Sequence, residues 1–308
     1  MKAPIAPQLT DHAISRNWPF PSRAHFCALA LYLLSVLLFW RPLVDLATLS
    51  VHDENSSHIL LIPLISAFII YLQRKSIFQA TRYSIAIGVP LLLTVVAMRY
   101  ALSATVPNWK SSDELPVTAA SIVLCWIAIF ITCYGTASFK SALFPLLYLA
   151  LMIPIPAVVM VHLVSVLQQG SADTCYHLFR LLGMPVLRHG FRFSLPAFDI
   201  EVAQQCSGIH SALALFVAGL LASHFLLEGT WRKLCFTLCI FPIAIFKNAV
   251  RIVALTWLAI HVNPAIFQGP LHRRGGLPFS FVGLALMAVV LWLLRCTSLL
   301  QENRERKT

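Results

Sequence analysis

Long runs of apolar residues decide what this chain can fold into. Eight such runs follow one another, at about 24–41, 58–73, 84–105, 117–134, 141–167, 206–227, 233–262 and 277–299. A helix of about 20 apolar residues crosses the hydrocarbon core of a bilayer, where its backbone polar groups must be satisfied within the segment. The sequence therefore predicts an all-α, polytopic bundle of about eight transmembrane helices, formed by a single membrane-embedded domain over 1–308.

The composition agrees with lipid as the solvent. Hydrophobic residues make up 58% of the 308 positions and charged residues only 11%, whereas a soluble globular protein has roughly 25% charged residues. The net charge of +11 comes largely from short basic clusters between apolar runs, such as Arg74/Lys75 and Arg232/Lys233. Such clusters are typical of cytoplasmic topology signals. No basic segment interleaved with aromatic residues occurs, which argues against nucleic-acid binding.

The distribution of lysine and arginine predicts the orientation. The first outer loop, 42–57, has neither Lys nor Arg, and it carries three acidic residues. Basic residues at 180–192 and 273–274 fall outside and weaken the bias without reversing it. We therefore expect tails 1–23 and 300–308 in the cytoplasm, an uncleaved first span, and loop 168–205 in the periplasm beside the inner membrane.

The long connection 168–205 has its own pattern. Apolar residues from Leu163 to Leu182 form an approximate helical stripe, which predicts a helix lying at the membrane interface. Apolar and polar residues then alternate over 191–195 and 199–202 around Pro196-Ala197, which predicts a short hairpin. This hairpin leads directly to Cys206, at the outer end of the sixth span.

The cysteines give no sign of a disulfide framework or a metal site. No C-x-x-C motif occurs among the 8 cysteines, and most lie within or at the ends of apolar runs, where cysteine acts as a small hydrophobic residue. Only Cys175 and Cys206 lie in or beside a polar connection. We expect no metal and no organic cofactor.

Three polar residues from separate segments meet at the outer face in this topology. Arg251 lies inside the seventh span, where a charge costs at least about 2.5–3.5 kcal/mol, and Asn248 lies one turn earlier. Cys206 lies at a helix start, which lowers the pKa of a thiol, and His272 lies in the last outer loop. A thiol, a base and a cation are the parts of a thiol acyl-transfer site. Singly, each also fits an ordinary helix-packing, buried or surface role.

The combination resembles the exosortase/archaeosortase family of membrane cysteine transpeptidases. The resemblance extends from about His58 to the eighth span, and it rests on the order and spacing of the following segments: Ser57-His58-Ile59-Leu60-Leu61-Ile62-Pro63-Leu64-Ile65, Met152-Ile153-Pro154-Ile155-Pro156, Leu182-Gly183-Met184-Pro185-Val186, the strand from Gly190 to Leu195, Glu201-Val202-Ala203, Cys206-Ser207-Gly208-Ile209, Asn248-Ala249-Val250-Arg251, and a histidine before the last span.

The resemblance implies that Cys206, Arg251 and His272 form the catalytic set. Ser207, Gly208, Asn248 and His58 would support it, with Gly208 letting a substrate backbone approach. The implied substrates are exported proteins that end in a Pro-Glu-Pro-type motif, a hydrophobic span and a basic tail. Such enzymes often accompany exopolysaccharide production, and the acceptor would be water or an amine at the cell surface.

Position 210 departs from the family pattern. His210 stands where arginine or another polar residue is usual, and it supplies a second candidate base one helical turn below Cys206. We expect His272 to be the base, because His210 lies about 6 Å deeper at about 1.5 Å of rise per residue. The Arg-Arg-Gly-Gly run after His272 is also unusual.

Two other functions remain open from the sequence. In a membrane transporter or lipid-linked glycan carrier, Arg251 would bind an anionic group within the bilayer. A catalytically inactive scaffold of the same fold is the third possibility. Replacing Cys206 with serine separates enzyme from carrier, because a carrier should tolerate the change.

Overall fold

The computed structural model describes residues 23–79, 82–105, 111–196, 198–204, 207–263 and 276–305. Helices dominate these residues, and the strands are few and short. In chain order the elements are α1 Arg23–Leu38, α2 Trp40–His52, η1 Glu54–Ser56, α3 Leu61–Leu72, α4 Arg74–Ile77, α5 Ile85–Thr105, α6 Ser111–Ser141, α7 Leu143–Tyr148, η2 Leu149–Met152, α8 Ala157–Leu181, β1 Leu187–His189, β2 Arg192–Ser194, β3 Asp199–Glu201, α9 Ile209–Leu226, α10 Thr230–His261 and α12 Gly276–Glu305.

The all-α membrane architecture is confirmed, whereas the count of eight spans is not. Within the described residues, 5 helical segments are long and apolar enough to cross a bilayer, or up to 7 if each of two bent pairs is one span. The bent pairs are α1 with α2, at 75°, and α7–η2 with α8, at 92°. The apolar part of α5, Ile85–Ala101, is shorter than these segments.

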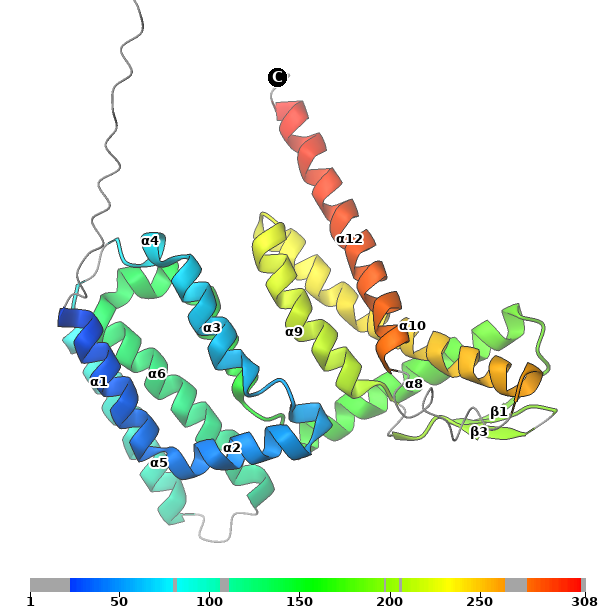
Figure 1. Cartoon of the computed structure of the whole chain (residues 1–308), viewed down its shortest axis with the longest axis horizontal. Coiled ribbons are helices and arrows are strands. Elements are labelled where there is room, and N and C mark those ends of the chain that lie inside the picture. The colour runs from blue at the N-terminus through cyan, green and yellow to red at the C-terminus, as the bar shows by residue number, and fades with distance from the viewer. Residues whose placement is uncertain are drawn as a thin grey trace, which may run out of the picture.

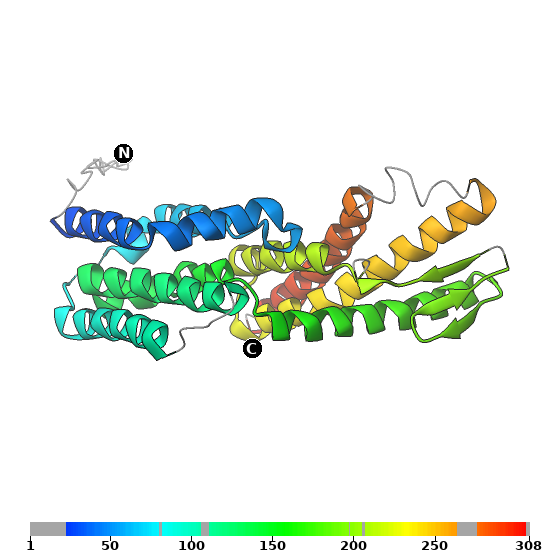
Figure 2. The same cartoon turned by 90° about the horizontal axis from the view of Figure 1, so that it is seen from below.

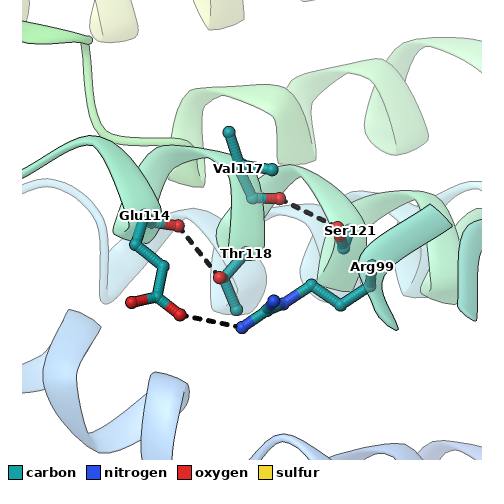
Figure 3. A network of polar contacts seen from close by, with 5 residues as sticks. All are labelled: Arg99, Glu114, Val117, Thr118 and Ser121. Carbon is teal, nitrogen blue, oxygen red and sulfur yellow. Dashed lines mark hydrogen bonds and ion pairs between the residues drawn. The ribbon is translucent and has the colours of Figure 1, made fainter. Parts of the chain in front are cut away.

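The first half of the chain packs around α6. Helices α1 and α5 lie beside it, and a buried apolar cluster from Ala24 to Met152 fills the space between them. Gly88 of α5 approaches α6 so closely that a Cβ there would lie 2.1 Å from the Thr132 hydroxyl. The two helices are also joined by an ion pair of 3.0 Å between Arg99 and Glu114 (Figure 3). Glycine at this contact therefore lets the backbones of α5 and α6 come together.

The second half consists of α8, α9, α10 and α12 with the small sheet. Helix α10 is its centre, because it packs against each of the other three helices. One apolar cluster lies between α9, α10 and α12, and another joins α8 and α10 to the strands. Both views place the strands beside the C-terminal parts of α8 and α10 (Figures 1 and 2).

The predicted hairpin is confirmed and gains a third strand. β2 pairs with β3 in antiparallel register, with Phe193 opposite Ile200, and β1 pairs with the other edge of β2. Phe193 is fully buried against Phe179 of α8, with ring centroids 5.8 Å apart. The alternation that indicated the hairpin thus reflects one apolar face packed on α8.

The boundary expected at residue 168 is wrong. The fifth span does not end before a separate interfacial helix, since α8 is continuous from Ala157 to Leu181. The break falls earlier, where Pro154 and Pro156 cannot donate backbone hydrogen bonds. Gly170 lies within α8 where Ile245 of α10 packs against it, and a Cβ there would lie 2.8 Å from the Ile245 side chain.

The placement of Cys175 also differs from the expectation of a polar connection. It lies within α8 and is fully buried, with its sulfur 3.7 Å from the carbonyl oxygen of Ala249 in α10. Residues on both sides of it pack on the strands and on α10. Cys175 is therefore a core residue of the second half.

The two halves meet along α9. Near its C-terminal end, His224 stacks on Phe144 and accepts a hydrogen bond of 2.9 Å from the Gln73 amide. In its middle, the carbonyl of Val217 accepts from the Tyr148 hydroxyl at 3.3 Å. At its N-terminal end, α9 contacts η1. These contacts hold α9, and with it the first turn of the helix, at a fixed place between the two halves.

The elements separate into two ends of the molecule. The α3–α4 turn, the α9–α10 turn and the C-terminal end of α12 lie at the top of Figure 1, and the sheet and the start of α9 lie lower. The turns at the top carry Arg74/Lys75 and Arg232/Lys233. The assignment of that end to the cytoplasm stays a prediction from the charge distribution.

Candidate active site

The first turn of α9 brings together most of the supporting residues expected from the sequence. Ser207 and Gly208 precede this helix, His210 lies in its first turn, and Asn248 and Arg251 come from α10. Cys206 and His272 lie outside the described residues. The structure therefore shows the residues that follow Cys206 in the chain. Of the expected catalytic set, Arg251 lies within the described residues.

Gly208 fixes the approach of α9 to α10. It has φ +78° and ψ +14° in the left-handed region, and it is the N-cap residue of α9. A Cβ there would lie 2.8 Å from Cγ of Asn248. The Asn248 side chain therefore occupies the side of Gly208 on which a Cβ would stand, and the approach of a substrate backbone to Gly208 stays a prediction. Glycine is required by both the left-handed conformation and the contact.

Asn248 is the junction of three helices. Its side chain is 1% exposed, and its amide nitrogen donates a hydrogen bond of 3.0 Å to the hydroxyl of Ser171 in α8. On the other side it meets Gly208 at the start of α9. The half-buried Arg251 follows on the next turn of α10. Asn248 therefore packs the helix that carries Arg251 against Gly208, which lies two residues after Cys206 in the chain.

Lys247 is a buried cation that the sequence reasoning did not single out. It is 1% exposed, and its ammonium group donates a hydrogen bond to the Ser211 hydroxyl in the first turn of α9. The Ser211 hydroxyl in turn donates to the carbonyl of Gly208 at 2.9 Å. Lipid makes a charge within a span as costly at position 247 as at position 251, so the sequence also indicates Lys247.

His210 bonds to the first half of the chain. Its side chain is exposed, and Nδ1 donates a hydrogen bond to the backbone carbonyl of Glu54 in η1. His58 lies two residues after the end of η1 and is close enough to His210 for the two rings to interact electrostatically. The hydrogen bond of His210 to Glu54 thus joins the start of α9 to the first half of the chain.

The strand that leads to the site is held by α8. The Gln168 amide donates a hydrogen bond of 2.6 Å to the carbonyl of Val202, and the Val202 NH donates to the carbonyl of Phe191 at 3.0 Å. Gln168 and Val202 are both buried. The chain therefore enters residues 203–207 from a fixed point on the sheet.

An apolar cavity adjoins the same turn of α9. It has a volume of about 160 Å³ and lies between α8, α9 and α10. Ile209 and Ala212 line it from α9, and Leu167 and Ala244 line it from the neighbouring helices. The cavity has the size and lining for one or two apolar side chains.

Two cations of α10 lie near the start of α9. Lys247 and Arg251 lie on successive turns of α10. Within the described parts of the chain, none of the ion pairs between side chains that we identify includes Lys247. Among those same residues, no group of three His, Cys, Asp or Glu side chains could hold a metal ion. Two cations, an amide and hydroxyl groups beside a helix start are suited to stabilising a negative charge.

Comparison with known proteins gives the family. The model of the family described as "Transmembrane exosortase (Exosortase_EpsH)" matches residues 49–293. This range includes positions 58, 206, 251 and 272 and the helices α3 to α10. No curated protein and no solved structure matches the chain significantly. With most of its length matched, the chain belongs to the transmembrane exosortase family.

Proposed function

We propose that this protein is a cysteine protease or transpeptidase that removes the C-terminal sorting tails of exported proteins at the outer face of the inner membrane. Its substrates carry a short motif, a hydrophobic span and a basic tail, and the activity accompanies exopolysaccharide production. Both termini lie in the cytoplasm. Cys206 is the nucleophile, His272 is the base, and Arg251 stabilises negative charge.

The reaction has two halves. The Cys206 thiol gives its proton to His272, and the sulfur attacks the peptide carbonyl that precedes the substrate's span. Arg251 stabilises the oxyanion, the C–N bond breaks, and His272 returns the proton to the leaving amine. Water or a surface amine then attacks the thioester and gives a proton to His272, the C–S bond breaks, and His272 returns the proton to the Cys206 sulfur. Electrons and protons balance without a cofactor.

The contact of Gly208 with Asn248 is the observation that most supports this proposal. It joins the turn two residues after Cys206 to the helix that carries Arg251. Gly208, which follows Cys206 closely in the chain, is therefore packed against the helix that carries Arg251. The apolar cavity beside Ile209 agrees with a substrate that brings apolar side chains to this place.

The test is processing of a reporter that carries such a tail, in membranes that contain either the native protein or Cys206→Ala. Cleavage by the native chain and full-length reporter with the variant would support the enzyme. A carrier that binds an anionic group at Arg251 would keep its function in Cys206→Ser, because oxygen is nearly isosteric with sulfur. Retained function in both Cys206 variants would therefore overturn the proposal.

A further inference from the structure

A buried lysine links α10 to the helix that begins just after Cys206. We propose that Lys247 is a positioning residue that holds the first turn of α9 through Ser211, and so fixes the backbone that leads to Cys206. The inference rests on the proposed function, because it gives Lys247 a part in the same site. It adds a residue that does not itself touch the reacting atoms.

The hydrogen bonds run in one direction from α10 to α9. The Lys247 ammonium donates to the Ser211 hydroxyl, and this hydroxyl donates to the Gly208 carbonyl at 2.9 Å. The same carbonyl accepts the backbone NH of Ala212 at 2.9 Å. The carbonyl at the N-cap of α9 is therefore held by the helix and by a side chain that Lys247 orients.

The aliphatic part of the Lys247 side chain is also held in place by packing. A Cβ on Gly283 of α12 would lie 3.3 Å from Cδ of Lys247, so the stem runs against the backbone of α12. The same Cβ would lie 3.0 Å from Leu215 of α9. Lys247 thus extends between α9 and α12, and its length brings the ammonium to Ser211.

Two neighbouring residues of α10 contact the start of α9 at two separate points. Asn248 packs on Gly208, and Lys247 bonds Ser211 three residues later. These two contacts add to the apolar packing of α9 against α10 and α12, and they act on the first turn of α9. This matters for a nucleophile, because a small misplacement of a reacting atom lowers the rate strongly.

A structural role alone does not account for a lysine here. An ammonium group is costly to bury, and an apolar side chain of similar length would fill the space between α9 and α12 at lower cost. Within the described residues we identify no carboxylate paired with Lys247. What lysine adds over an apolar residue is the hydrogen bond to Ser211.

The experiment is a double-mutant cycle of Lys247→Met and Ser211→Ala, with processing of the tailed reporter measured at equal membrane abundance. Methionine keeps most of the stem, and alanine removes only the hydroxyl. Loss of a hydrogen bond to a charged group predicts about a tenfold lower kcat for each variant. KM should change little, and the double variant should be no slower than Lys247→Met, because both changes break one connection.

Ser223→Ala is the matched control. Ser223 is buried in the same helix and donates to the carbonyl three residues earlier, Leu220, at 2.8 Å, as Ser211 does to Gly208. No lysine is bonded to it in the described structure. Its replacement should leave kcat within about twofold of the native value.

Two outcomes would overturn the inference. Native kcat in Ser211→Ala would show that the hydroxyl positions nothing, and independent losses that multiply in the double variant would show that Lys247 acts by another route. Ser211→Ala keeps the test valid even if Lys247→Met fails to fold. If Cys206→Ala still processes the reporter, the proposed function fails. If Cys206→Ala is inactive but Ser211→Ala has the native kcat, only the inference about Lys247 fails.

Discussion

Gly208 lies directly against the side chain of Asn248, so that a Cβ on the glycine would be 2.8 Å from the Asn248 Cγ. The contact joins residues 40 positions apart in sequence, one at the start of α9 and the other in the middle of α10. Because Cys206 and Arg251 flank these two residues along the chain, the geometry of the proposed site depends on this contact.

Gly208→Ala should destabilise the protein by more than about 2 kcal/mol, since a left-handed alanine costs about 1–2 kcal/mol and the contact with Asn248 adds to it. The midpoint of thermal unfolding in detergent measures the effect. Gly183→Ala is the matched control, because Gly183 also has positive φ, at +69°, but nothing lies within 4 Å of its Cβ position. Equal shifts in the two variants would mean that the Asn248 contact contributes nothing.

Cys206→Ala should abolish processing, whereas Cys175→Ala should still process the reporter. Cys175 is fully buried in α8, so its truncation should cost about 1–2 kcal/mol of stability through a small cavity. Reporter cleavage and thermal unfolding, measured on the same membranes, separate the two effects. Equal processing by both variants would remove Cys206 from the mechanism.

Arg251→Lys should not restore activity, and it should lower kcat by about 100-fold or more. A guanidinium group offers several directed donors, whereas an ammonium group is a point charge on a flexible stem. Arg251→Gln serves as the neutral control. Native rates in Arg251→Lys would show that position 251 needs only a positive charge.

His272→Ala should lower kcat by about 100-fold or more, as expected for loss of a general base. His210→Ala should have a much smaller effect, because the ring of His210 is bonded to the Glu54 carbonyl of η1. Both variants are assayed at equal membrane abundance. Loss with His210→Ala and retention with His272→Ala would make the unusual residue at position 210 the base.

The sequence by itself determined the class of fold and the hairpin of β2 and β3. Lipid offers no partner to a backbone polar group, so long uncharged runs predict helices whatever their neighbours are. Alternation over 191–202 predicted the hairpin because one face of a strand pair packs on a core. The cost of a charge in lipid indicates Arg251 and, by the same physics, Lys247.

Only the tertiary structure decided how the helices divide and what the site residues touch. Membrane helices are apolar on every face, so periodicity does not separate protein-facing from lipid-facing sides. Gly170 of α8 packs against Ile245, and Cys175 is buried against α10. Gly208 and Ser211 acquire their roles from Asn248 and Lys247. These contacts join segments far apart in the chain, and close packing of side chains, which no local pattern encodes, selects them.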